Sequence, residues 1–303
     1  MSGRKVVVTG SSGFVGSQLV KVLVQQHYEV LSLDSSSPQE MPPSIECLGI
    51  DLNEISLGDL VALVKDAVIV HLAAFSTSSK CEAEKANAID ANLKATSKII
   101  EAANAAKSKL IFASSEWVFP DSSKIVEYSS DQEPSLRADT NFYAMTKIVG
   151  EWMVRRYSSN YLILRFGIIY GERLNVQSAV ENIVHCAVNF KTLRLGNLNT
   201  SRRFIHVLDI CSGIIRCIEE IDKVGNRIFH LSGEKLISLN EIIKITEFLF
   251  GEEISKIVDE SVASIRDLSP QSFYDFFDWK PAVSIESGVT KLITWEKIRR
   301  DPL

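Results

Sequence analysis

Three side chains in the first half of the chain have types and spacing suited to moving a proton to or from a hydroxyl group. Tyr143 and Lys147 lie four residues apart, so on a helix they share one face. A free tyrosine has a pKa near ~10, and a neighbouring ammonium stabilises the phenolate and lowers that pKa. Ser115 follows a predicted strand, and its hydroxyl can hydrogen-bond the same reacting oxygen. The set predicts acid–base chemistry on an alcohol or a carbonyl.

A glycine-rich turn precedes this set in the chain. Gly10, Gly13 and Gly16 follow the β-branched run Lys5–Thr9 and open the helical pattern Phe14–Gln26. The first glycine permits a tight turn, the second lets the backbone approach a pyrophosphate, and the third lets the helix pack closely on the strand. The N-terminus of that helix offers N–H groups and a positive dipole end. Although the spacing is GxxGxxG rather than GxGxxG, the strand–turn–helix context predicts a dinucleotide site.

An acidic residue stands where such a site needs one. Asp34 lies 18 residues after the last of the three glycines, at the end of the predicted strand Glu29–Leu33. A carboxylate there can accept hydrogen bonds from both ribose hydroxyls and would repel a 2′-phosphate. No Arg or Lys occurs within Leu31–Met41 to offset that repulsion, so the sequence favours NAD over NADP. Asp51 ends the next extended segment and is expected near the adenine.

The elements that must position these residues alternate between strand and helix. Further strands are predicted at Val68–Leu72, Lys109–Phe112 and Tyr161–Arg165, and further helices at Ala83–Ala106 and Asn141–Tyr157. This alternation predicts an α/β fold, a Rossmann-type doubly wound parallel sheet with helices on both faces.

The pattern changes after Gly171. The expected order is a helix at Val176–Phe190, a polar irregular stretch at Thr192–Arg203, a strand at Arg203–Val207, a helix at Asp209–Ile221, and short elements from Leu236 onward. We therefore expect a smaller C-terminal substrate-binding α/β cap. Residues 1–171, with about 203–232, would form the NAD-binding domain, and about 172–202 with 233–303 the substrate-binding domain.

Composition excludes several classes of function. The 303 residues are 46% hydrophobic and 23% charged, with a formal net charge of -5, which argues against nucleic acid as a partner. No apolar run approaches the roughly 20 residues that cross a bilayer, and no secretory signal opens the chain. The five cysteines form no CxxC pair, so we expect reduced thiols in a cytoplasmic protein and no metal site.

Together these motifs resemble the extended short-chain dehydrogenase/reductases, the NAD-dependent epimerase/dehydratase family, from Arg4 to about Ile293. The likeness also includes His71-Leu-Ala-Ala74, Leu164-Arg165, Tyr170-Gly171, the run from Arg202 to Asp209, and Asp278-Trp279-Lys280-Pro281. The resemblance implies catalysis by Ser115, Tyr143 and Lys147. It implies that NAD is held by Gly10, Gly13, Phe14, Val15, Gly16, Asp34, Asp51, Leu52, Ala73, Asn92, Tyr143 and Lys147.

The resemblance also implies a nucleotide-diphosphate sugar as substrate. It would be bound by Ser115, Glu116 and Arg202, the last of which matches the arginine that grips the substrate diphosphate; a guanidinium fork suits that role. Two departures bear on the substrate. Trp117 stands where dehydratases of the family carry a glutamate base, and Ile168 stands in a stretch where many sugar-nucleotide enzymes carry a diphosphate-binding asparagine.

The leading hypothesis is a nucleotide-sugar epimerase that transiently oxidises C4 of the sugar. The alternatives are an NAD(P)H-dependent 4-keto-sugar-nucleotide reductase, which the run Ser115–Phe119 also resembles, and a nucleotide-sugar dehydratase. A dehydrogenase of a non-nucleotide alcohol and a non-catalytic NAD-binding regulator stay open behind them. The family resemblance also implies a homodimer that pairs through the helices predicted at Ala83–Ala106 and Asn141–Tyr157.

Overall fold

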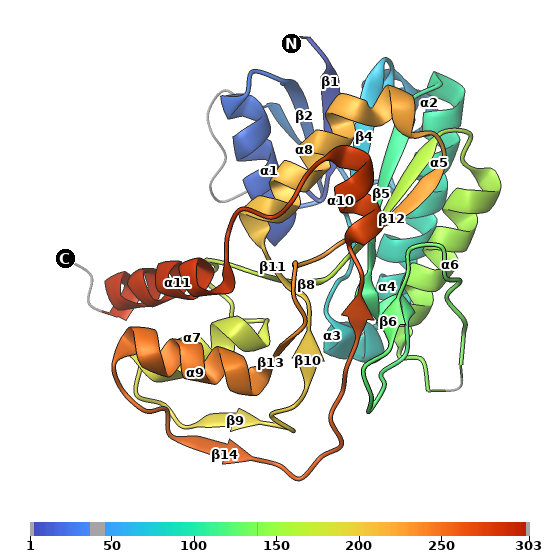
Figure 1. Cartoon of the computed structure of the whole chain (residues 1–303). Helices are drawn as coiled ribbons and strands as arrows, with labels where there is room; N and C mark the ends of the chain where they lie inside the picture. The colour runs from blue at the N-terminus through green and yellow to red at the C-terminus, as the bar shows by residue number, and fades with distance from the viewer. Residues whose placement is uncertain (1–2, 37–45, 138, 301–303) are drawn as a thin grey trace. The chain divides into compact units, whose positions relative to one another are not determined.

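The computed structural model describes residues 3–36, 46–137 and 139–300. The chain folds into two compact units, which are described separately (Figure 1). The first unit comprises Met1–Val118, Glu133–Arg165 and Cys211–Phe229, and the second comprises Phe119–Gln132, Phe166–Ile210 and His230–Leu303.

A seven-stranded sheet organises the first unit. Its strands are β1 (Lys5–Thr9), β2 (Glu29–Asp34), β3 (Glu46–Gly49), β4 (Ala67–His71), β5 (Lys109–Ser115), β7 (Tyr161–Phe166) and β12 (Arg227–Leu231). They lie in the order β12-β7-β5-β4-β1-β2-β3, and the pairs from β3 through β5 run parallel. This is the Rossmann strand order, which reverses direction between β1 and β4. The predicted doubly wound α/β fold is confirmed.

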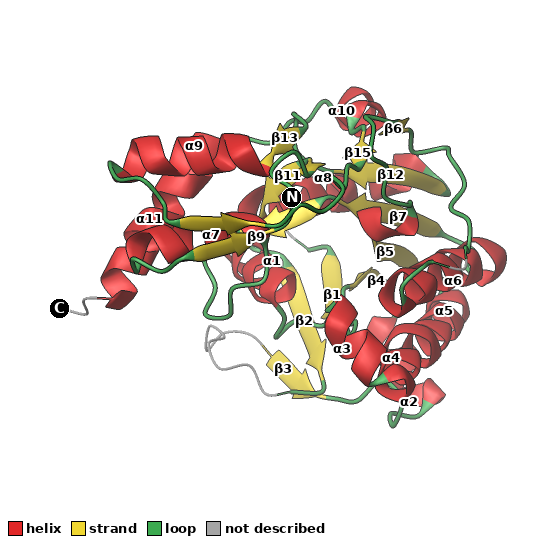
Figure 2. Cartoon of the chain, turned by 90° about the horizontal axis from the view of Figure 1, so that it is seen from below, coloured by secondary structure: helices red, strands yellow, loops and turns green. Residues whose placement is uncertain are grey.

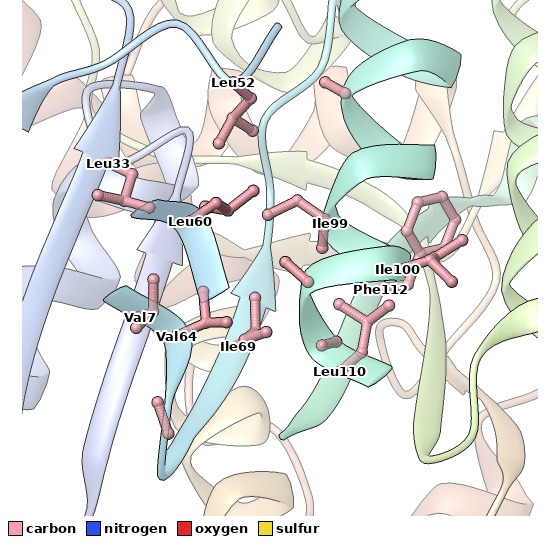
Figure 3. Packing of buried hydrophobic residues seen from close by; sticks show 14 of the residues in the cluster. Val7, Leu33, Leu52, Leu60, Val64, Ile69, Ile99, Ile100, Leu110 and Phe112 are labelled. Carbon is pink, nitrogen blue, oxygen red and sulfur yellow. The ribbon is translucent and has the colours of Figure 1, made fainter. Parts of the chain in front are cut away.

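Helices cover both faces of this sheet, because its strands direct apolar side chains toward both faces. They are α1 (Phe14–Gln25), α2 (Leu57–Val64), α5 (Ala95–Ala106), α6 (Phe142–Tyr157) and α8 (Val207–Val224). Figure 2 shows α5 and α6 on one face, and α1 and α8 on the other. Figure 3 shows the packing on the first face, where Val7, Ile69 and Leu110 of three strands meet side chains of α2 and α5.

The second unit packs three helices around shorter strands. Its elements are β6 (Glu127–Tyr128), β8 (Ile168–Tyr170), α7 (Ala179–Val188), β9 (Leu193–Leu195), β10 (Ser201–Arg202), β11 (Phe204–His206), β13 (Ile237–Ser238), α9 (Leu239–Phe250), β14 (Lys256–Val258), β15 (Asp267–Leu268), α10 (Gln271–Phe277) and α11 (Ile285–Arg300). Val184 of α7, Ile242 of α9 and Val289 of α11 are buried in one apolar cluster. Ser178 and Ser238 begin α7 and α9 with capping boxes.

The boundaries of the units differ from those expected from the sequence. Residues 119–132 and 166–171 belong to the second unit rather than to a continuous segment 1–171. The reason is strand pairing: β6 pairs with β15, and β8 pairs with β11. Such pairs join segments far apart in the chain, and no local pattern reveals them.

Four predicted elements are corrected by the structure. The helix expected at Ala83–Ala106 is divided into α3 (Ser78–Ala83), α4 (Lys85–Ile89), a π-helical turn (Asp90–Lys94) and α5. The expected helix Val176–Phe190 is shorter, because the Ser178 cap sets the start of α7. The stretch Thr192–Arg203 is not wholly irregular, since β9 and β10 pair with β14 and β13. The elements after Leu236 are not all short: α9 has 12 residues and α11 has 16.

Among the described residues, no helix is both long and apolar enough to cross a membrane.

Candidate active site

The glycine turn between β1 and α1 brings bare backbone to the carboxyl edge of the sheet. Gly10 has a φ of +69°, and a Cβ atom there would lie 2.6 Å from the backbone nitrogen of Ala73. A Cβ on Gly16 would lie 2.1 Å from the carbonyl oxygen of Gly10. Gly13 precedes α1 and has no side chain to cap it, and the first turn of α1, Phe14 and Val15 included, carries no acidic residue. The positive end of the helix dipole is therefore available to an anion, which fits a pyrophosphate.

Asp34 ends β2 beside this turn. One of its carboxylate oxygens accepts a hydrogen bond from the Ser12 backbone nitrogen at 2.8 Å. The other accepts from the backbone nitrogen and the hydroxyl of Ser36, at 2.9 and 2.8 Å. A carboxylate has about four acceptor positions, so it retains capacity for a further hydroxyl donor. The structure thus holds the acidic residue and the glycine turn together, as a ribose and its pyrophosphate require.

The other sequence-predicted cofactor residues follow neighbouring strands. Asp51 lies beyond β3 and is exposed, whereas Leu52 is buried in the apolar cluster under the sheet. Ala73 lies beyond β4, against Gly10. Asn92 is buried in the π-helical turn. Its amide oxygen accepts from the Phe75 backbone nitrogen at 2.6 Å, and its amide nitrogen donates to the Phe75 carbonyl and to the Thr146 hydroxyl.

Ser115, Tyr143 and Lys147 meet at the carboxyl end of β5. Ser115 is the last residue of β5, and α6, which begins after an Asn141 cap, carries the other two on its buried face. The Ser115 hydroxyl is hydrogen-bonded to the Tyr143 phenol. The Lys147 ammonium donates to the Ala113 carbonyl at 2.9 Å and lies 5.9 Å from the centre of the Tyr143 ring. The structure brings together the three residues that the sequence predicted as catalytic.

Burial sets the protonation of this group. It raises the pKa of Tyr143 to about 12; the Ser115 hydrogen bond lowers that pKa, and the nearby acidic groups Cys81 and Glu116 oppose ionisation of the phenol. Burial also lowers the pKa of Lys147 to about 8. The pKa of Tyr143 is therefore raised rather than depressed in the chain by itself, because desolvation of the phenolate is the largest effect on it. At neutral pH Tyr143 holds its proton and Lys147 is mostly charged.

Arg202, the predicted substrate arginine, lies in the second unit. Its guanidinium donates to the Ser264 carbonyl and hydroxyl, both at 2.5 Å, and to the Asp121 carboxylate at 3.1 Å. Arg266 is buried beside it and reaches the same carboxylate at 3.0 Å. Two guanidinium groups thus share one acid. No local pattern in the sequence points to Arg266, because only the fold brings residues 202 and 266 together.

The sequence model of the NAD dependent epimerase/dehydratase family matches residues 6–232 of this chain. The chain belongs to this family. The match covers most of the chain and confirms the resemblance seen in its motifs.

Relatives of this family member differ in the names they carry. A putative UDP-glucose 4-epimerase of Methanocaldococcus jannaschii is 24% identical, over 96% of this chain and 98% of that protein. Methionine adenosyltransferase 2 subunit beta of Xenopus laevis is 26% identical, over 88% of this chain and 80% of that protein. The structure of UDP-glucuronic acid 4-epimerase from Bacillus cereus, with UDP-glucuronic acid and NAD, has a TM-score of 0.82 and 23% identity, covering 97% of this chain and 99% of that one. The last likeness concerns the fold.

Groups around Tyr143 limit the chemistry open to this member of the family. Glu116 is fully buried directly after Ser115, and Trp117 packs with the apolar cluster that contains Tyr143 and Cys81. Glu82 is exposed, and its pKa is lowered chiefly by the hydrogen bond that it accepts from the Phe142 backbone. A carboxylate with a lowered pKa is a weaker base. Among the described residues, no group of three or more His, Cys, Asp or Glu side chains is arranged to hold a metal ion.

Two polar arrangements under the site escaped sequence analysis. His71 is buried between the Thr9 hydroxyl, at 2.7 Å, and the Thr96 hydroxyl, at 3.0 Å, and burial lowers its pKa to about 3. Glu151 forms a buried ion pair with Arg165, at 2.8 Å. The available signal was the spacing of Glu151, four residues after Lys147, which continues the stripe that begins at Tyr143.

Proposed function

We propose that this chain is an NAD-dependent epimerase that inverts C4 of the sugar in a nucleotide-diphosphate sugar. The observation that carries the proposal is the convergence of Ser115, Tyr143 and Lys147 at the carboxyl end of β5. A non-catalytic regulator, the alternative class, has no need of this set. The M. jannaschii relative and the B. cereus structure, whose names describe 4-epimerases of UDP-sugars, support the same assignment.

Tyr143 and Ser115 would exchange the proton of the C4 hydroxyl. Bound NAD supplies a place for the hydride that leaves C4 and later returns to it. As the phenolate, which forms when it releases its own proton, Tyr143 would take the hydroxyl proton as the carbonyl forms and give it back when the 4-keto sugar has turned over. Ser115 hydrogen-bonds the same oxygen, and the charged Lys147 favours the phenolate while the proton is away.

The first unit would bind the cofactor and the second the substrate. We assign the cofactor contacts to Gly10, Gly13, Phe14, Val15, Gly16, Asp34, Asp51, Leu52, Ala73, Asn92, Tyr143 and Lys147. Arg202 would bind the substrate diphosphate, and Arg266 adds a second cation at the same carboxylate. Ser115 and Glu116 would contact the sugar. Ile168 has no side-chain amide that could bind the diphosphate, so the two arginines would recognise it.

We expect NAD to bind at least about tenfold more tightly than NADP, a difference of roughly 1.4 kcal/mol. The 2′-phosphate would approach the Asp34 carboxylate, which the Ser12 and Ser36 donors hold in place. Fluorescence titration of the two cofactors measures the ratio. Replacing Asp34 by Asn should reduce the ratio of NAD affinity to NADP affinity. Equal affinities in the unmodified chain would show that Asp34 does not select against NADP.

We further expect epimerisation without dehydration. Dehydration needs a base for the C5 proton, and the Trp117 indole N–H only donates a hydrogen bond. Cys81 is buried and its pKa is raised, while Glu82 has a lowered pKa, so neither is a matched replacement. Incubation of enzyme, NAD and UDP-, dTDP- and GDP-hexoses in heavy water should change the C4 configuration with no deuterium at C5.

These mixtures, and a second set that contains reduced cofactor and a 4-keto sugar nucleotide, separate the alternatives. Deuterium at C5 together with a 4-keto-6-deoxy product would indicate a dehydratase. Net consumption of reduced cofactor with a 4-keto sugar nucleotide would indicate the reductase. Cofactor that stays bound through purification and is detected by mass spectrometry supports the epimerase, because its NAD is regenerated in each turnover.

We also propose that the protein is a cytoplasmic homodimer. Helix α6 exposes Trp152 and Tyr157, with 57% and 56% of their surfaces accessible, and the two rings contact each other to form an apolar patch on this helix. The five cysteines are free, as a reducing compartment maintains them. Sedimentation at micromolar concentration should give twice the 33.7 kDa of the chain. A monomer would contradict this pairing.

A further inference from the structure

A fully buried ion pair lies directly beneath the catalytic set. Glu151 is 2% exposed and Arg165 is not exposed at all. The Arg165 guanidinium donates to both carboxylate oxygens, from Nε at 2.9 Å and from Nη2 at 2.8 Å. The Ser114 hydroxyl donates to the same carboxylate at 2.5 Å. Burying two charges costs several kcal/mol per ion, so such a pair does not by itself imply stability and its presence calls for another reason.

Glu151 joins the two elements that carry the catalytic residues. Tyr143, Lys147 and Glu151 form one buried stripe on α6, each a turn beyond the last. This stripe contacts three successive residues at the end of β5. The Ala113 carbonyl accepts from Lys147, the Ser114 hydroxyl donates to Glu151, and the Ser115 hydroxyl bonds to Tyr143.

The helix also lies close enough to the strand for the register to matter. A Cβ atom on Gly150 would lie 2.9 Å from the Phe112 ring, and the Lys147 ammonium lies 5.2 Å from the centre of that ring. Arg165 extends from β7, the neighbour of β5 in the sheet, and so fixes Glu151 from a third element. A shift of one helix residue would break all of these contacts together.

We propose that Glu151 is a positioning residue for the reaction: it holds the Ser114–Ser115 end of β5 against α6 and supplies the negative charge that balances the Lys147 ammonium. Arg165 holds the carboxylate in place. This inference rests on the proposed function, in which a charged Lys147 supports Tyr143.

The groups that act on the Lys147 charge single out Glu151. They are Cys81 of α3, His71 of β4, and Tyr143 and Glu151 of α6. Burial raises the pKa of the Cys81 thiol and lowers that of His71 to about 3, and Tyr143 has a pKa of about 12. These three groups are neutral near pH 7, so Glu151 is the anion of the set. Its charge raises the pKa of Lys147 against the effect of burial.

The test compares two variants that break the same ion pair in opposite ways. Glu151→Gln removes the negative charge but keeps an oxygen that can accept from Ser114. Arg165→Met removes the partner and keeps the carboxylate. Titration of the full chain, with its lysines carbon-13 labelled at Cε, follows Lys147 by NMR; Lys147→Arg assigns its signal. The double variant Glu151→Gln/Arg165→Met, which leaves no unpaired charge, controls for misfolding.

In the unmodified chain Lys147 should titrate near pH 8. Glu151→Gln should lower that midpoint by about one pH unit, in the single and the double variant alike. Arg165→Met should not lower it. With such a shift, kcat of Glu151→Gln should fall about twofold at pH 7 and close to tenfold at pH 9 relative to the unmodified enzyme.

An unchanged Lys147 midpoint in Glu151→Gln overturns the inference, and so does an equal decrease in Arg165→Met, which would mark the pair as structural only. The NMR titration needs no turnover. Absence of epimerase activity in the unmodified chain therefore contradicts the proposed function alone and leaves this test decisive.

Discussion

Replacing Tyr143 by Phe is expected to lower kcat by about a thousandfold, within the range measured for the loss of a general acid–base group. The substitution removes only the phenolic oxygen, so the buried ring keeps its place in the apolar cluster with Cys81 and Ala88. Tyr143 is only 9% exposed, so bulk water has little access to the position that the phenolic oxygen leaves. C4 inversion, assayed with saturating UDP-sugar and NAD, measures the loss.

The matched control is Tyr161→Phe, the same chemical change at the start of β7, at the opposite end of that strand from Phe166. It should leave kcat within about twofold of the unmodified enzyme, because Tyr161 is half-buried at the end of β7 away from the catalytic set and keeps its ring in the substitution. NAD affinity should be retained in both variants, since the glycine turn and Asp34 are untouched. A Tyr143→Phe enzyme that keeps a tenth or more of the activity would require another proton acceptor.

Replacing Gly16 by Ala is expected to abolish cofactor binding at assay concentrations and to lower the free energy of unfolding by about 3 kcal/mol. The new Cβ atom would lie 2.1 Å from the Gly10 carbonyl oxygen, and no rotamer change can move either the Cβ atom or this backbone oxygen. The turn must then open, which displaces the N-terminus of α1 from the site of the pyrophosphate. Thermal unfolding and NAD titration measure the two effects.

Gly58→Ala provides the control on a helix of the same unit. A Cβ atom there meets only the Ser56 hydroxyl oxygen, at 3.9 Å, an ordinary contact. Alanine is the better helix former by up to about 1 kcal/mol, so this variant should be as stable as the unmodified chain or slightly more so. If Gly16→Ala and Gly58→Ala bind NAD equally well, the turn is not the pyrophosphate site.

The predictions of helices and strands in the first unit were correct where they rested on a local pattern of residues. The β-branched run at Lys5–Thr9 and the apolar spacing after Phe14 correspond to β1 and α1. Tyr143 and Lys147 share a helix face because helical spacing alone places them there. Where a side chain takes its partner from another element, the local pattern failed: Asn92 bonds to Phe75 and Thr146, in the π-helical turn that interrupts the expected long helix.

By itself, the sequence predicted the Rossmann-type fold and the glycine turn with its acidic residue, which follow from periodicity and short spacing. The prediction of Ser115, Tyr143 and Lys147 as one catalytic set rested on the order of the motifs and on the family resemblance. Only the tertiary structure decided the protonation of that set, because burial depends on what surrounds a side chain and is the largest effect on the pKa of both Tyr143 and Lys147. It alone also joined Glu151 to Arg165, since a buried charge finds its partner through packing rather than through spacing in the chain.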